Sequence, residues 1–129
     1  VINFWSTWCP PCRQEAWLLE ATWRSYRDRE VQFVGVMIQD TVQNGRGYLN
    51  EFDITYPNVV DTGGRTTVDY GVIGLPVTFF VGRDGVVEGR WVGAIPEDKL
   101  LAWTDRLVAG AGVFDDNEGE NLEGYQEFD

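Results

Sequence analysis

The chain contains two cysteines, Cys9 and Cys12, and two prolines, Pro10 and Pro11, separate them. A cysteine pair at this spacing can serve as a structural disulfide, as part of a metal site or as a redox centre. A disulfide that closes so short a loop stabilises a fold by only about 2 kcal/mol, through the entropy of the unfolded chain. Stabilisation is therefore a weak reason for placing both thiols here.

A metal site also fits this composition poorly. A closed zinc site takes four ligands, most often Cys and His, and the 129 residues include two Cys and no His. Carboxylates or a second subunit would have to complete the ligand set. We therefore expect no metal and no diffusible cofactor, which leaves a Cys9–Cys12 redox pair.

The surrounding pattern favours that redox pair. An apolar strand precedes Cys9, and a helix is predicted to begin at Pro10. The free N–H groups and partial positive charge of a helix N-terminus favour a thiolate, so we predict that Cys9 is the attacking thiol and is reachable from solvent. Cys12, one turn into the helix and less exposed, suits the resolving thiol. Pro10 and Pro11 fit the first turn, where a missing N–H costs little, and they stiffen the loop.

The hydrophobic pattern predicts a mixed α/β arrangement. Two β-rich runs with a helical segment between them should pair in parallel, and an Asp-Gly turn between two later β-rich runs predicts an antiparallel hairpin. The order indicates one mixed central sheet flanked by helices on both faces. The expected strands are 1–5, 31–38, 58–61, 77–81 and 86–92, and the expected helices are 10–29, 43–52, a turn ending at 70, and 96–110.

Charge divides the chain into two parts. Residues 111–129 hold seven of the 21 acids and none of the 10 bases, so residues 1–110 carry 14 acids against 10 bases. We expect one domain over 1–110 and a solvated, disordered acidic tail over 111–129. Nucleic acid is a poor partner for such a chain because phosphate binding requires a basic face.

The first residues begin inside an apolar strand. We expect the native protein to start earlier, so that the sequence is N-terminally truncated and any signal peptide or membrane anchor would precede it. No run in the printed sequence approaches the ~20 apolar residues of a membrane span.

Three segments together resemble a known family. Residues 1–13 ("VINFWSTWCPPCR") resemble the active-site segment of the thioredoxin superfamily, and are most similar to the TlpA/ResA/DsbE-like thiol–disulfide oxidoreductases of bacteria. Residues 70–87 ("YGVIGLPVTFFVGRDGVV") resemble that family's cis-proline segment and hairpin, and residues 58–72 resemble its strand–helix insertion. The resemblance covers about residues 1–108 and implies a thioredoxin fold.

The resemblance also implies a function. It implies an extracytoplasmic enzyme, in the periplasm or on the outer face of the cytoplasmic membrane, that reduces disulfides of protein substrates with cysteine pairs. Apocytochrome c is a plausible client, and an upstream electron donor in the membrane would restore the dithiol. We expect a monomer. The direction of electron flow does not follow from the sequence, because it depends on how strongly the thiolate is stabilised.

The resemblance assigns further residues to the site. Pro76 matches the cis-proline beside the cysteines, and the Leu75 backbone would pair with an extended client segment. Trp8 would form a partly exposed wall for substrate, together with Pro10 and Pro11.

One position departs from thioredoxins proper. Asn3 replaces the buried aspartate that shuttles protons there, and Asn cannot titrate. Asp40 matches a family acid after the second strand and is the candidate for that proton transfer, although the family residue is the longer glutamate. The alternative is that Asp40 only caps the following turn.

Two other functions compete with this one. A non-catalytic module could keep the fold and hold extended peptides near Pro76, in which case a variant without both cysteines would still bind its partner. A general cytoplasmic thioredoxin-like reductase is the other alternative, and Asn3 and the insertion at 58–72 argue against it.

Overall fold

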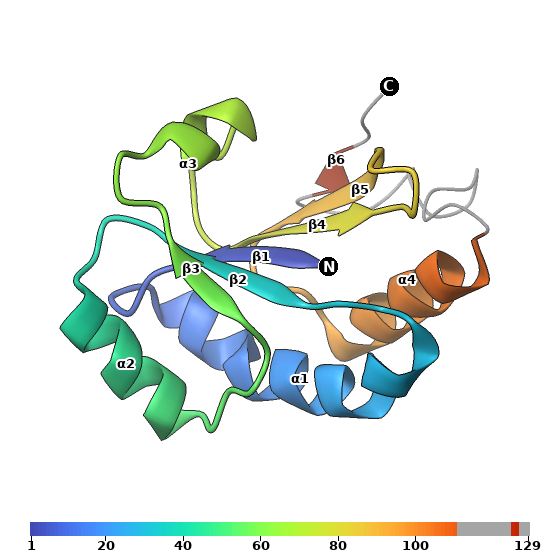
Figure 1. The fold of residues 1–129 in the computed structure, drawn as a ribbon, viewed down its shortest axis with the longest axis horizontal. Helices are drawn as coiled ribbons and strands as arrows, with labels where there is room; N and C mark the ends of the chain where they lie inside the picture. The colour runs from blue at the N-terminus through green and yellow to red at the C-terminus, as the bar shows by residue number, and fades with distance from the viewer. Residues whose placement is uncertain (111–124, 127–129) are drawn as a thin grey trace.

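A twisted β-sheet runs through the part of the chain that the computed structural model describes, residues 1–110 and 125–126 (Figure 1). Within that part the sheet has six strands in the order β3-β2-β1-β4-β5-β6. Their bounds are β1 (Ile2–Trp5), β2 (Val34–Met37), β3 (Asn58–Val60), β4 (Val77–Val81), β5 (Val87–Val92) and β6 (Tyr125–Gln126). The predicted acidic tail over 111–129 lies, apart from β6, outside the described residues.

The pairing of the strands confirms the mixed sheet. β1 pairs in parallel with β2, and β2 pairs in parallel with β3. β4 runs antiparallel to both β1 and β5. Because β1 is central, its C-terminal end, where Trp5 leads toward the cysteines, meets the start of β4 just after Pro76.

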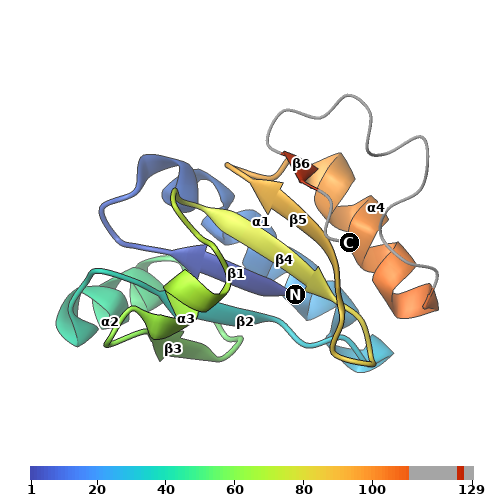
Figure 2. The ribbon, with the colours of Figure 1, turned by 90° about the horizontal axis from the view of Figure 1, so that it is seen from above.

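Helices cover both faces of the sheet, as predicted. They are α1 (Pro10–Tyr26), a 3₁₀ turn (Arg27–Arg29), α2 (Val42–Glu51), α3 (Arg65–Asp69) and α4 (Glu97–Ala109). Helices α1, α2 and α4 lie on one face, and the short α3 lies on the other (Figures 1 and 2). The first helix ends three residues earlier than its apolar pattern suggested, because residues 27–29 tighten into the 3₁₀ turn and Glu30 takes a left-handed conformation with φ 62°.

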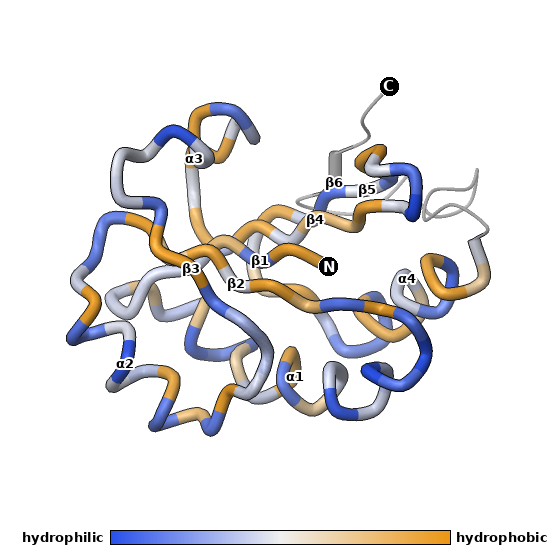
Figure 3. The backbone as a smooth tube through the Cα atoms, viewed as in Figure 1, coloured by the Kyte–Doolittle hydropathy of each residue, from blue (hydrophilic) through white to orange (hydrophobic). Residues whose placement is uncertain are grey.

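Alternation along β1 and β4 assigns their side chains to the two faces. Phe4 and Phe79 pack against Tyr70, which directly follows α3, whereas Phe80 packs against Trp103 of α4 on the other face. Figure 3 shows the resulting pattern, with apolar strands at the centre and helices that alternate between apolar and polar residues. Trp5 is directed to the α1 and α2 side, where it forms part of the packing around the cysteines.

Candidate active site

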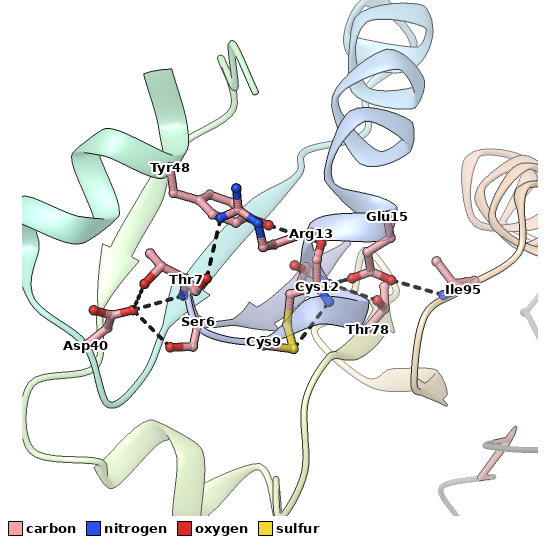
Figure 4. The surroundings of a disulfide bond; sticks show 11 residues. Ser6, Thr7, Cys9, Cys12, Arg13, Glu15, Asp40, Tyr48, Thr78 and Ile95 are labelled. Carbon is pink, nitrogen blue, oxygen red and sulfur yellow. Dashed lines mark hydrogen bonds between the residues drawn. A yellow bond between two sulfur atoms is a disulfide. The ribbon is translucent and has the colours of Figure 1, made fainter. Parts of the chain in front are cut away.

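Cys9 and Cys12 form a disulfide at the N-terminus of α1, with their Cα atoms 5.3 Å apart (Figure 4). Cys9 is the N-cap residue, in extended conformation, and Pro10 and Pro11 occupy the first two helical positions. Proline has no N–H, so the first backbone N–H group of the helix belongs to Cys12. This amide donates a hydrogen bond to Cys9 Sγ over 3.2 Å. A negative charge on the Cys9 sulfur would therefore be stabilised by this amide and by the helix dipole.

Cys9 is buried more deeply than the sequence suggested, although it lines a cavity. Cys9 is only 3% exposed and Cys12 only 1%. The reason is that Cys9 lies at the wall of a cavity of about 330 Å³ rather than on the outer surface. A substrate sulfur must enter this cavity to reach it. The cavity is lined by Trp8, Cys9, Pro10, Pro11, Ile38, Gln39, Thr67, Val72, Ile73, Gly74 and Leu75.

Five of the predicted site residues therefore meet in this one cavity. Trp8 is 56% exposed, as predicted, and its indole Nε1 donates to the Gln39 carbonyl over 3.1 Å. Leu75 packs against the cluster that holds both cysteines. The Leu75–Pro76 peptide bond is cis, as the resemblance implied, and Pro76 itself is buried.

Asp40 lies beside the loop that leads to Cys9 and makes no hydrogen bond to either cysteine. Its Oδ2 accepts from the Ser6 hydroxyl over 3.0 Å and from both the amide and the hydroxyl of Thr7. Its Oδ1 accepts from the Thr41 amide over 2.8 Å and from the Asn44 side chain over 2.9 Å. This geometry favours the alternative in which Asp40 caps the following turn, and it also anchors the loop at residues 6–7.

The same contacts keep Asp40 ionised. Burial by itself favours the neutral acid, but the hydrogen bonds from Thr7 and Asn44 outweigh it and hold the pKa of Asp40 well below its usual value. A carboxyl group that stays charged throughout the neutral range is a poor acceptor for a thiol proton. The proton transfer predicted for Asp40 has no support in this geometry.

A different acid, Glu15, lies on the next turn of α1 after Cys12, and the sequence analysis missed it. Glu15 is only 3% exposed. It accepts a hydrogen bond of 2.7 Å from the Asn3 side chain and one of 3.0 Å from the Ile95 amide. Burial raises the pKa of Glu15 to about 7, although both hydrogen bonds oppose the rise. A group with this pKa can take or give a proton near neutral pH.

A signal for Glu15 was present in the sequence. Cys12, Glu15, Ala16 and Leu19 follow the spacing of one helix face. The other members of that face are buried, so the carboxyl must be buried with them. An acid on the apolar stripe of the helix that carries the cysteines is an anomaly, and such anomalies mark functional sites.

An aromatic layer supports the cysteines from the α2 side. The Tyr48 hydroxyl donates to the Cys12 carbonyl over 3.1 Å, and the Tyr48 ring stacks on Trp5 with centroids 4.3 Å apart. Trp5 Nε1 in turn donates to Asn58 Oδ1 over 2.9 Å. This contact passes directly over Gly35 of β2, which leaves no room for a side chain there. Packing thus fixes the first turn of α1 to the sheet and to α2.

Residues 1–110 and 125–126 contain no group of three or more His, Cys, Asp or Glu residues that could hold a metal ion. None of the helices described is both long and apolar enough to cross a bilayer.

Comparison with known proteins identifies the family. Residues 1–90 match the AhpC/TSA family. The thiol–disulfide oxidoreductase ResA of Bacillus thuringiensis subsp. konkukian (strain 97-27) is 31% identical over 107 residues, which are 83% of this chain and 62% of ResA. The thiol:disulfide interchange protein HelX of Rhodobacter capsulatus is 32% identical over 111 residues, which are 85% of this chain and 61% of HelX. The chain thus spans about three fifths of the length of these curated relatives.

Solved structures agree with this likeness. A thiol:disulfide interchange protein of the thioredoxin family from Chlorobium tepidum TLS superposes with a TM-score of 0.71 and 30% identity, over 85% of this chain and 77% of that one. StoA from Bacillus subtilis superposes with a TM-score of 0.71 and 26% identity, over 80% of this chain and 79% of that one. The chain therefore belongs to the AhpC/TSA family and, within the thioredoxin superfamily, is a member of the TlpA/ResA/DsbE-like group.

Proposed function

We propose that this protein is a thiol–disulfide oxidoreductase that reduces disulfides in other proteins. The observation that carries the proposal is the Cys9–Cys12 disulfide, placed at a helix N-terminus and at the wall of a cavity that a substrate can enter. The names of its relatives, ResA and HelX among them, describe the same chemistry.

The reaction is a two-step exchange that begins with the dithiol form. The Cys9 thiolate attacks one sulfur of a client disulfide, so that a Cys9–client mixed disulfide forms and the other client sulfur leaves as a thiolate. The Cys12 sulfur, having lost its proton, then attacks Cys9 Sγ and releases the second client thiolate. Two electrons pass to the client, and the Cys9–Cys12 disulfide remains.

We assign to Glu15 the role of taking the proton of Cys12, on the basis of its place on the same helix and its raised pKa rather than of a direct hydrogen bond to the sulfur. Cys12 is almost fully buried, so its thiol loses a proton only if a nearby acceptor is available. Glu15 lies one turn further along α1 and has a pKa of about 7. Asn3 cannot accept this proton itself, but its hydrogen bond holds the Glu15 carboxyl in place.

The start of β4 supplies a docking edge for the client. Leu75 lines the cavity, and Pro76 follows it directly before β4 begins at Val77. An extended client segment that enters here would continue the sheet through hydrogen bonds to the Leu75 backbone. Trp8, which also lines the cavity and is 56% exposed, would contact the client side chains.

The setting of the enzyme completes the proposal. We place it outside the cytoplasm, where client disulfides form, and an electron donor in the membrane would return the two electrons that each cycle uses. Apocytochrome c is the proposed client, and its heme-binding cysteines would be kept reduced. These assignments rest on the likeness to the TlpA/ResA/DsbE-like group.

Reduction of insulin by dithiothreitol tests the activity. We expect the protein to accelerate the precipitation of the insulin B chain, and the Cys9→Ser variant to lose the acceleration. Turnover no faster than the uncatalysed reaction would overturn the proposal. The non-catalytic alternative is separated by a variant without both cysteines, which would then keep full affinity for the partner.

A further inference from the structure

A second cavity adjoins the cavity beside the disulfide. The second cavity has a volume of about 400 Å³ and lies between the end of β2 and the loop before α3. Ile38, Gln39 and Thr67 line both cavities, so the two lie side by side and together extend from Cys9 to the loop before α3; we refer to them as the groove. The far end of the groove is formed by Asp61, Thr62, Gly63, Gly64 and Val68.

The groove is predominantly uncharged. Apart from the cysteine, none of the side chains around the first cavity can ionise, and Asp61 is the only acid around the second. The rim carries large apolar side chains in contact with solvent, with Trp8 at 56%, Val68 at 76% and Ile73 at 100% exposure. A charged client segment would lose water here without gaining a partner, whereas an apolar segment would bury these side chains.

Gly63 has no explanation in the fold itself. Its φ is not positive, and a Cβ built on it meets no atom within 4 Å. Neither backbone geometry nor internal packing therefore requires glycine. A residue without a side chain at this point leaves the end of the groove open to the backbone of another chain.

The wall around Gly63 is preformed. Asp61 accepts hydrogen bonds from the amide of Thr66 over 3.2 Å and from the amide and hydroxyl of Thr67 over 2.7 and 2.5 Å. These bonds tie the loop to the start of α3, so the groove exists before any client binds and little ordering is needed on binding.

We propose that the groove from Cys9 to Gly63 binds an extended, uncharged segment of the client beyond its reacting cysteine, and so selects clients whose disulfides lie within such segments. The proposal rests on the proposed function, because the occupant is the substrate of the same disulfide. It adds a substrate class and assigns a specificity role to the insertion that carries α3.

Two peptide disulfides and two variants test the proposal. The short substrate is a disulfide-linked pair of Ala-Cys-Ala, and the long one extends about five uncharged residues, ~17 Å when extended, on both sides of the cysteine. Reduction of each is followed with dithiothreitol as electron donor. The variant is Gly63→Leu, and the matched control is Gly47→Leu on the exposed side of α2, where a Cβ also meets nothing within 4 Å.

The expected result is a kcat/KM about tenfold higher for the long peptide than for the short one, which corresponds to about 1.4 kcal/mol. Gly63→Leu should abolish most of this ratio, and Gly47→Leu should preserve it. Three results would contradict binding in the groove without contradicting the activity. They are equal kcat/KM values for the two peptides, a long-to-short ratio that Gly63→Leu leaves unchanged, and a ratio that falls as much in Gly47→Leu as in Gly63→Leu. Failure to reduce either peptide would instead contradict the proposed function.

Discussion

The Asn3 side chain, on the central strand, donates a 2.7 Å hydrogen bond to the carboxyl group of Glu15, on the helix that carries both cysteines. Asn3 also donates to the Thr78 hydroxyl over 3.1 Å. A titrating acid at Asn3 would lie on the sheet, whereas here the acid lies on the helix and the sheet supplies its hydrogen-bond donor.

Glu15→Gln should change how stability depends on pH. In the folded oxidised protein the pKa of Glu15 is about 7 against an ordinary value of 4.5, so the folded state binds the proton more tightly. The protonated Glu15 makes its full contribution to the stability of the folded state below about pH 4.5. As the pH rises toward 7, the free energy of unfolding falls by about 3 kcal/mol in total. Urea unfolding across this range should show the loss in the wild type and not in Glu15→Gln.

Glutamine should fit at this position. If the Asn3 side-chain amide rotates by 180°, Asn3 Oδ1 can accept one hydrogen bond from the side-chain NH2 group of the introduced glutamine and another from the Thr78 hydroxyl. A parallel Glu97→Gln substitution, at an exposed position in the first turn of α4, is the control and should retain the wild-type pH dependence. A Glu15→Gln curve as steep as that of the wild type would disprove the assignment.

Asp40→Asn should destabilise the protein without removing its redox chemistry. Asn can replace only one of the two oxygens that accept hydrogen bonds from the 6–7 loop and from residues 41 and 44, and we expect a loss of about 1–3 kcal/mol. Because the pKa of Asp40 is lowered on folding, this contribution is present above about pH 3.8 and disappears as the pH falls further. The free energies of unfolding of the wild type and of Asp40→Asn, measured at pH 7 and at pH 3, give both the loss of stability and its dependence on pH.

The catalytic part of this prediction separates the two roles of Asp40. Insulin reduction by Asp40→Asn should keep the pH profile of the wild type, since the carboxyl does not exchange protons near neutral pH. If the inflection of the pH profile of insulin reduction moves in Asp40→Asn but not in Glu15→Gln, Asp40 and not Glu15 takes part in the proton transfer. The exposed Asp28 provides a control substitution to Asn that should change neither property.

Gly35→Ala should weaken the support of the cysteines. A Cβ at this position would lie 1.8 Å from Asn58 Oδ1 and 2.8 Å from Trp5 Nε1, so the hydrogen bond between these side chains must break. We expect a loss of about 1–3 kcal/mol in the free energy of unfolding. Gly47→Ala, within α2 and with open space around it, should instead stabilise the protein by up to about 1 kcal/mol. Similar stabilities for the two variants would contradict this view of the packing.

Cys12→Ser should trap the client. Without the resolving thiol, the Cys9–client mixed disulfide has no internal route to release. Non-reducing electrophoresis after mixing with a disulfide-bonded client should show an adduct that dithiothreitol removes. The adduct should form with Cys12→Ser and be absent with Cys9→Ser. Adducts of equal yield from both variants would contradict the assignment of Cys9 as the attacking residue.

Much of the fold could be predicted because the signals are local. The apolar run at 31–38, the Pro10–Pro11 start of α1 and the Asp84–Gly85 turn each specify an element from neighbouring residues alone. The cysteine pair and the cis-proline could be predicted because their spacing and context match those of the family.

The features of the site that the sequence did not reveal have a common cause. Exposure of Cys9 depends on residues from the segment before β4, far away in sequence, that close around the sulfur. The roles of Asp40 and Glu15 depend on which side chains fold against them, and a pKa is set by that environment rather than by residue type. The burial of Glu15 can be read from its place on the apolar face of α1, but its pKa and that of Asp40 depend on contacts with residues of other elements.

The pH dependence of alkylation of the reduced Cys12→Ser variant tests the central claim most directly, because Cys9 is then the only thiol and the amide of residue 12 is retained. The helix N-terminus should lower the pKa of Cys9 below the ordinary value of about 8.5, so iodoacetamide should react with the native protein at pH 7 faster than with a free cysteine of ordinary pKa. A rate that follows the titration of an ordinary thiol, or a sulfur that reacts only after unfolding, would contradict the account.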